Sequence, residues 1–155
     1  MNNVDYQTIV LPGFVLQGLS AEILPTSDPS EVIGKLWQEF AKGDFSNKIP
    51  EMTRGIIFSV YTNYLHKDHS AYTIYVGCKV SEELAVVPGL GRVEVPGSTF
   101  AMFLARGPMP QSVSDAWQQI NAKNLDRAYR ADYDIYGPKS QNHANSEVEI
   151  FVSVN

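Results

Sequence analysis

The amino-acid sequence predicts an α+β fold made of two β-α-β-β units related by a pseudo-two-fold axis. A Pro-Gly pair opens a strand twice, at residues 12–13 and at residues 96–97. Each of these strands is followed by one amphipathic helix that carries a tryptophan, Trp37 or Trp117, and then by two further strands. Alternation of apolar and polar residues along the strands indicates a sheet. We therefore expect a curved antiparallel sheet with two helices on one face and a central cleft.

The expected elements of the first half are, in order, strands at 8–11 and 14–23, a helix that starts at 29, and strands at 56–61 and 72–80. The first two are either one bent strand or two strands joined at Pro12-Gly13. Asp28 can cap the helix, with Pro29 at its first position, and Gly43 ends it. The apolar residues of this helix recur at helical spacing. They are Val32, Ile33, Leu36, Trp37 and Phe40.

The expected elements of the second half are a short extended segment at 92–95, a strand at 99–105, a helix that starts near Pro110, and strands at 131–136 and 147–154. Val113, Trp117 and Ile120 form the apolar stripe of the helix. The segments at 44–55 and 139–146 are polar and are expected to be loops.

Composition limits the class of protein. The 155 residues fit one domain with halves at about residues 6–85 and 90–155. One cysteine cannot form an internal disulfide, and a net charge of −5 without a basic run argues against a nucleic-acid surface. The N-terminus lacks a signal peptide, and no stretch approaches the ~20 apolar residues of a membrane span. A soluble cytoplasmic protein is therefore expected.

We expect the aliphatic face of each strand to meet the helices and the opposite face to line the cleft. The side chains on that opposite face are Ser59, Tyr61, Tyr75, Phe103, Asp134, Tyr136, Glu149 and Phe151. Aromatic rings attract cations and supply apolar area. A carboxylate in a partly dry pocket needs a counter-charge. A cleft lined in this way suits a small amphipathic organic cation.

Four parts of the sequence resemble the GyrI-like family of small-molecule (effector) binding domains. They are residues 36–40, residues 57–61 with 72–80, residues 95–103 with Gly107-Pro108 and the helix of Trp117, and residues 133–136 with 147–152. Each part alone is weakly specific, whereas their order and spacing together are fairly specific. The resemblance covers residues 8 to 154.

Members of this family are the effector domains of AraC-type and multidrug-responsive bacterial transcription activators, or stand alone. The resemblance implies a duplicated β-α-β-β fold and a cleft for lipophilic, often cationic, compounds. The family's Phe-Glu-x-Tyr motif corresponds to residues 133–136, so Asp134 stands where the cleft glutamate is found and is one methylene shorter. No helix-turn-helix segment is apparent, so we expect the sensor module without a DNA-binding domain.

The expected ligand-binding residues are Trp37, Tyr61, Tyr75, Phe103, Asp134, Tyr136, Glu149 and Phe151. Asp134 is the expected electrostatic anchor, and Glu149 is a candidate second acid. His66 and His69 flank Asp68 in a turn that we interpret as a solvated loop, and we expect no metal, cofactor or catalytic residue. Two alternatives to a binding module stay open: a hydrolase that uses a cleft carboxylate, and a protein inhibitor or regulator. A homodimer or a separate regulatory partner protein is compatible with the sequence.

Overall fold

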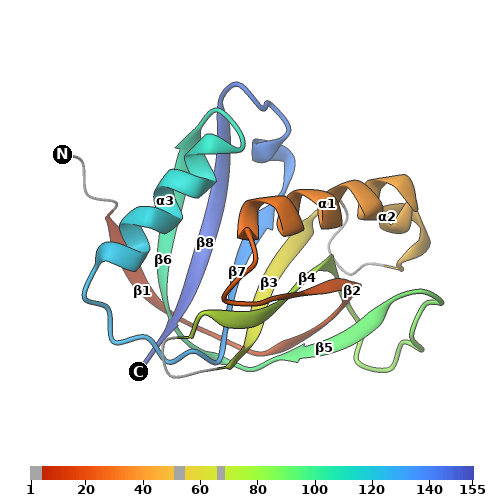
Figure 1. Ribbon diagram of the computed structural model, residues 1–155. Helices are drawn as coiled ribbons and strands as arrows, with labels where there is room; N and C mark the ends of the chain where they lie inside the picture. The colour runs from red at the N-terminus through yellow and green to blue at the C-terminus, as the bar shows by residue number, and fades with distance from the viewer. Residues whose placement is uncertain (1–4, 51–54, 66–68) are drawn as a thin grey trace.

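The structure is a computed structural model that describes residues 5–50, 55–65 and 69–155 (Figure 1). Its strands are β1 (Tyr6–Leu11), β2 (Phe14–Ile23), β3 (Ile57–Leu65), β4 (Ala71–Val80), β5 (Gly91–Val95), β6 (Ser98–Gly107), β7 (Ala131–Tyr136) and β8 (Ser146–Val154). Its helices are α1 (Pro29–Lys42), α2 (Phe45–Lys48) and α3 (Gln111–Ala122), with a 3-10 turn η1 (Pro138–Ser140). The predicted α+β class is confirmed. None of the described helices combines the length and apolarity needed to cross a membrane.

The strands form one antiparallel sheet in the order β1-β6-β8-β7-β3-β4-β2-β5. This order reads the same from both ends when β1 to β4 are matched with β5 to β8. The pseudo-two-fold axis therefore passes between β3 and β7, which pair from Ile57 with Tyr136 to Thr62 with Ala131. The duplication that the sequence predicts thus organises the whole sheet.

The first strand of each half pairs with the other half. Only Pro12-Gly13 separates β1 from β2, yet β1 pairs with β6 while β2 pairs with β4 and β5. Pro96-Gly97 separates β5 from β6 in the same way. The sheet must therefore curl so that its two ends meet where these turns cross. At the crossing, a Cβ on Gly13 would lie 2.6 Å from the carbonyl oxygen of Val95, so a larger residue does not fit.

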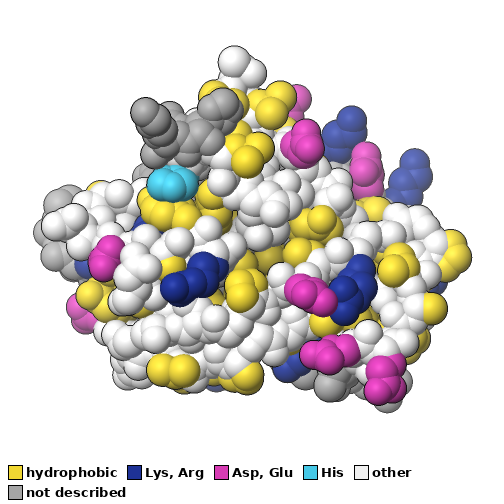
Figure 2. All heavy atoms as spheres, turned by 90° about the horizontal axis from the view of Figure 1, so that it is seen from below, with side chains coloured by type: hydrophobic (Ala, Val, Ile, Leu, Met, Phe, Trp, Pro, Cys, Tyr) yellow, Lys and Arg dark blue, Asp and Glu magenta, His cyan; other side chains and the backbone are white. Residues whose placement is uncertain are grey.

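Both long helices lie on one face of the sheet (Figure 1). Leu36 and Phe40 of α1 pack on β2 and β4, and Ala116 and Ile120 of α3 pack on β6 and β8. The other face carries a third core that contains no helical residue, and the curled sheet itself covers it. The members of this helix-free core are Leu16, Phe58, Val60, Val95, Phe100, Ala131, Tyr133 and Phe151. Seen from below, Figure 2 shows small hydrophobic patches between charges of both signs.

The structure settles or corrects several local expectations. Residues 6–11 and 14–23 are two strands with different partners, not one bent strand. The sequence predicts a loop at 45–48, but this segment forms α2, in which the apolar Phe45 packs on Phe40 with ring centroids 6.0 Å apart. Residues 138–140 of the second expected loop form η1. The expected turn around His66 lies outside the described residues, except for His69.

Candidate functional site

Asp134 lies in the middle of β7 and is completely buried. Its Oδ2 accepts hydrogen bonds from the hydroxyl groups of Tyr61, at 2.6 Å, and Tyr136, at 3.2 Å. Its Oδ1 accepts one from the indole Nε1 of Trp117, at 3.1 Å. None of these donors is charged, and no ion pair to Asp134 is present among the described residues. A buried carboxyl group is thus held by neutral donors alone.

This carboxyl group lies at the junction of the two halves. In the pairing of β3 with β7, Ser59 is opposite Asp134 and Tyr61 is opposite Asp132. Directly opposite residues point to the same face of an antiparallel pair, so all of these side chains point toward the helices. The hydroxyl of Ser59 is buried without a hydrogen-bond partner at normal distance in the described part of the chain. Because α1 packs mainly on β2 and β4 and α3 on β6 and β8, the side chains of β3 and β7 meet between the helices.

Five aromatic residues surround Asp134, and we call these six residues the aromatic-acid cluster: Trp37, Tyr61, Tyr72, Trp117, Asp134 and Tyr136. Trp37 of α1 meets Tyr136 edge-on with ring centroids 4.8 Å apart. Trp117 of α3 meets Tyr61 at 5.2 Å, and Tyr72 of β4 meets Tyr61 at 6.1 Å. Each half thus contributes one helical tryptophan to the cluster.

Burial dominates the electrostatics of the cluster. It raises the pKa of Asp134 to about 7, although the three donated hydrogen bonds act in the opposite direction. Burial and the neighbouring carboxylate raise the pKa of Tyr61 and of Tyr136 well above the usual tyrosine value, so both hydroxyls stay protonated and donate. Near neutral pH, Asp134 therefore changes between a neutral acid and an anion that has no internal counter-charge.

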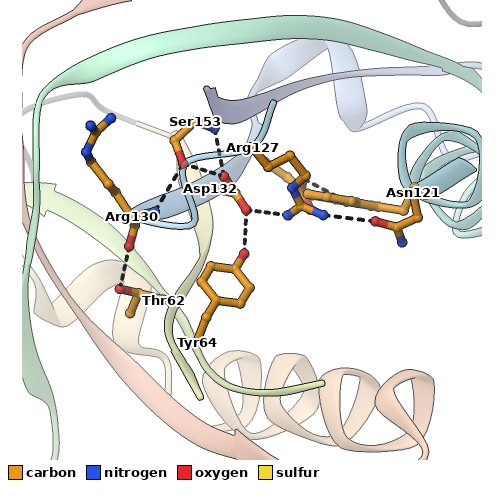
Figure 3. A network of polar contacts seen from close by, with 9 residues as sticks. Thr62, Tyr64, Asn121, Arg127, Arg130, Asp132 and Ser153 are labelled. Carbon is orange, nitrogen blue, oxygen red and sulfur yellow. Dashed lines mark hydrogen bonds and ion pairs between the residues drawn. The ribbon is translucent and has the colours of Figure 1, made fainter. Parts of the chain in front are cut away.

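Asp132, two residues earlier on the same strand, has different surroundings (Figure 3). It is also fully buried, but its Oδ2 forms an ion pair with Nη2 of Arg127 at 2.7 Å and accepts a hydrogen bond from the hydroxyl of Tyr64. Its Oδ1 accepts the backbone N–H and the hydroxyl of Ser153, at 2.7 and 3.1 Å. One of the two neighbouring buried aspartates therefore has a cation from the chain itself, and the other does not.

Four of the eight predicted ligand-binding residues come together in the aromatic-acid cluster: Trp37, Tyr61, Asp134 and Tyr136. The expectation that the predicted set shares the sheet face opposite the helices is wrong. Tyr61 of β3 and Asp134 and Tyr136 of β7 point toward the helices, because these strands lie between α1 and α3 and do not need an aliphatic face there.

The other four predicted residues lie elsewhere. Phe151 belongs to the helix-free core and stacks on Tyr133 with centroids 5.1 Å apart, and Tyr75 packs at the margin of that core. Glu149 is exposed on the same face, so it is not a second acid beside Asp134. Phe103 faces α3 but is buried beneath it, two strands away from β7.

Sequence reasoning missed three contributors to the site. Trp117 was expected only as part of an apolar helix stripe, although its equivalence to Trp37 was a usable signal. Alternation placed Tyr72 toward the helices without assigning it a role. The pairing of Asp132 with Arg127 had no signal in the sequence, because it depends on how the segment before β7 folds back.

Asp134 has no exposed surface in this structure, and a hollow of the described surface lies elsewhere. That hollow measures about 680 Å³ and lies beside α3, against β6 and the start of β1. Within the described ranges, no group of three or more His, Cys, Asp or Glu side chains could hold a metal ion. The chemistry available at the cluster is therefore that of one titratable carboxyl group among aromatic rings.

The chain is similar in sequence to one curated protein and in fold to several solved structures. BrlR, a transcriptional regulator of Pseudomonas aeruginosa, is 22% identical over 164 residues. The match covers 99% of this chain but only 57% of BrlR, so the chain spans little more than half the length of that relative. The structure of SAV2435 bound to tetraphenylphosphonium has a TM-score of 0.80 at 13% identity, with 97% of this chain and 94% of that chain covered. An integron cassette protein of Vibrio cholerae has a TM-score of 0.69 at 27% identity, with 99% of this chain and 100% of that chain covered.

The resemblance to GyrI-like effector-binding domains is confirmed at the level of the family. A family model described as "Integron-associated effector binding protein" matches residues 9–154, which is nearly the whole chain. The chain therefore belongs to the integron-associated effector binding protein family, Cass2.

Proposed function

We propose that the protein binds small amphipathic organic cations at the aromatic-acid cluster. The contrast between its two buried aspartates carries this proposal. Asp132 has the guanidinium group of Arg127 at 2.7 Å, whereas Asp134 has only neutral donors. Burying a carboxylate without a counter-charge is costly. A ligand cation would supply to Asp134 the charge that Arg127 supplies to Asp132.

The aromatic rings would supply the rest of the recognition. Trp37, Trp117 and the three tyrosines offer ring faces to a cation and apolar area to its substituents. Such contacts tolerate different ligand shapes because they require few directional hydrogen bonds. The short side chain of Asp134 would require the cationic atom to come close to β7. These features favour lipophilic cations as a class over one particular compound.

Binding requires the cluster to open. Both carboxylate oxygens of Asp134 are occupied, and the residue is fully buried. An incoming cation must therefore displace at least one donor, either the indole of Trp117 or a tyrosine hydroxyl. Ring contacts with the ligand would then replace ring contacts within the cluster. We expect ligand association to include this rearrangement.

The similar proteins support the proposal. The family is one of effector-binding proteins, and SAV2435, which has the same fold, was solved with tetraphenylphosphonium, a lipophilic cation. BrlR is a transcriptional regulator. We infer that the protein senses or sequesters such compounds in the cytoplasm, alone or together with a separate regulatory partner protein.

Tetraphenylphosphonium and tetraphenylborate have nearly the same shape and opposite charge, so they test the proposal directly. We expect the first to bind the wild-type protein and the second not to bind in a tryptophan-fluorescence titration. Asp134→Asn should weaken binding of the cation, whereas Glu149→Gln, which removes the same charge from an exposed site, should not. Equal binding of both ions, or equal effects of both substitutions, would contradict the role of Asp134.

The raised pKa of Asp134 predicts a specific pH dependence. Below about pH 7 the carboxyl group carries a proton that the cation must displace, and above it the carboxylate is free. The affinity for tetraphenylphosphonium should therefore fall about tenfold per pH unit below this value and stay constant above it. Calorimetry in two buffers of different ionisation enthalpy should detect the released proton, and Asp134→Asn should abolish the release. An affinity that is flat with pH in the wild-type protein would count against this linkage.

A hydrolase is the second candidate function, and the pKa of Asp134 favours it. A carboxyl group that titrates near neutral pH can act as a general base toward water. Hydrolysis of an activated ester should then rise with pH through about 7 and disappear in Asp134→Ala while the circular dichroism spectrum is unchanged. Turnover that survives this substitution would exclude Asp134 as the base.

A further inference from the structure

Trp117 joins the aromatic-acid cluster to the polar network around Asp132. Its indole N–H donates to Oδ1 of Asp134 at 3.1 Å, and its ring lies against Tyr61. The guanidinium carbon of Arg127 lies over the same indole, 5.9 Å from the ring centroid. Trp117 therefore contacts Asp134 directly and is linked to Asp132 through Arg127.

Arg127 is fixed by contacts with several parts of the chain (Figure 3). Nη2 pairs with Asp132 at 2.7 Å, and Nη1 donates to Oδ1 of Asn121, at the end of α3, at 3.1 Å. Its guanidinium carbon lies 4.5 Å from the ring centroid of Tyr129. Burial lowers the pKa of Arg127, but Asp132 and the nearby tyrosines outweigh this and raise it, so the group stays charged. A planar cation is thus held rigidly beside Trp117.

The segment that carries Arg127 keeps its shape through these contacts. Tyr129 has a φ of 54°, in the left-handed region that non-glycine residues rarely adopt. Its ring stacks on His69, whose φ is 57°, with centroids 3.6 Å apart. Local backbone preference does not explain this conformation, so the packing around Arg127 and Tyr129 must maintain it.

We propose that Arg127, anchored by Asp132, is a positioning residue that holds Trp117 over Asp134 and sets how readily the aromatic-acid cluster opens. A cation can reach Oδ1 of Asp134 only after the indole has moved away. The contact between the guanidinium and the indole stabilises the closed position and opposes that movement. The ligand-binding part of this inference rests on the proposed function, whereas the part that concerns Trp117 does not.

The first test observes Trp117 itself. The chain has two tryptophans, so labelling with 5-fluorotryptophan gives two ¹⁹F signals, which Trp37→Phe assigns. In Arg127→Gln we expect the Trp117 signal to shift or broaden and its indole N–H to exchange with solvent about tenfold faster. The matched control is Arg130→Gln, which removes the same charge from an exposed residue that bonds to Ser98. The control should leave both readouts unchanged.

The second test measures association with tetraphenylphosphonium by stopped-flow fluorescence. Arg127→Gln should raise the association rate about tenfold, and Arg130→Gln should not change it. Arg127→Lys keeps the charge beside Asp132 but loses the planar guanidinium, so its effect on the association rate should be intermediate. The lysine variant also replaces Arg127→Gln in both tests if the glutamine variant does not fold. An unchanged Trp117 signal and exchange rate in the folded Arg127 variants would overturn the proposal. If the wild-type protein does not bind tetraphenylphosphonium, the proposed function fails, while the indole measurements still decide the role of Arg127.

Discussion

Replacing Asp134 with asparagine removes the titratable group from the aromatic-acid cluster and nearly preserves its size. The pKa of Asp134 is about 7 in the folded protein, against ~3.9 for aspartate in an unfolded chain. Between these values the folded state binds a proton that the unfolded state does not bind. Raising the pH across this range therefore lowers the free energy of unfolding, and the loss is complete above about pH 7.

The magnitude follows from the difference of about 3 pKa units, which corresponds to about 4 kcal/mol. Asparagine is uncharged at every pH and has no such dependence. We therefore expect Asp134→Asn to exceed the wild-type protein in stability by about 4 kcal/mol near pH 8 and by about 1–2 kcal/mol near pH 5. For a domain of this size the gain corresponds to a rise in Tm of roughly 8–16 °C.

Urea denaturation followed by tryptophan fluorescence, from about pH 5 to about pH 8.5, measures this difference. Both proteins contain the same histidines, so the titration of those residues cancels when one profile is subtracted from the other. Glu149→Gln is the matched control, because it changes the same charge at an exposed position and should follow the wild-type profile. A stability difference between Asp134→Asn and wild type that does not change with pH would refute the reasoning.

Two further predictions concern the partners of the two aspartates. Asp132→Asn should lower the free energy of unfolding by about 3–5 kcal/mol, because it leaves Arg127 buried without its ion-pair partner. If urea denaturation near pH 8 showed that Asp132→Asn stabilises the protein, as Asp134→Asn is expected to do, this prediction would be contradicted. Tyr61→Phe removes the shortest hydrogen bond to Asp134 and should raise the pKa of Asp134 above about 7. Tyr136→Phe, which removes a longer bond, should raise it less. A ¹³C NMR titration of the carboxyl group checks the order of the two tyrosine variants, and the reverse order would show that the hydrogen-bond lengths do not rank the donors.

The two aspartates also show why the unpaired one points to a function. A buried acid that lacks a cation weakens the fold, and nothing in the packing of β7 requires Asp134 to be ionisable. Such conflicts between stability and local chemistry are typical of binding and active sites. A cationic ligand would relieve the conflict at Asp134, as Arg127 does at Asp132.

Particular residues show how far the sequence predicted the site. The sequence places Tyr61 and Tyr136 at equivalent positions of the two halves and Asp134 in the motif at 133–136. All three residues meet in the structure, although β3 continues past Tyr61 to Leu65. Glu149 and Phe151 were grouped with them by alternation and do not meet them. Alternation sorts the residues of each strand into two sets, but it does not say which set faces the helices.

The sequence by itself determined the α+β class, the two related halves, nearly all of the strands and both long helices, because these depend on periodicity and on turn and cap residues that act locally. It also singled out Asp134 and two of its tyrosines. Only the tertiary structure decided that β1 and β5 exchange between the halves, that Ser59 lies opposite Asp134, and that Arg127 pairs with Asp132 and not with Asp134. These features depend on contacts between residues far apart in the chain, and local propensity does not encode which distant partner a strand or a charge will meet.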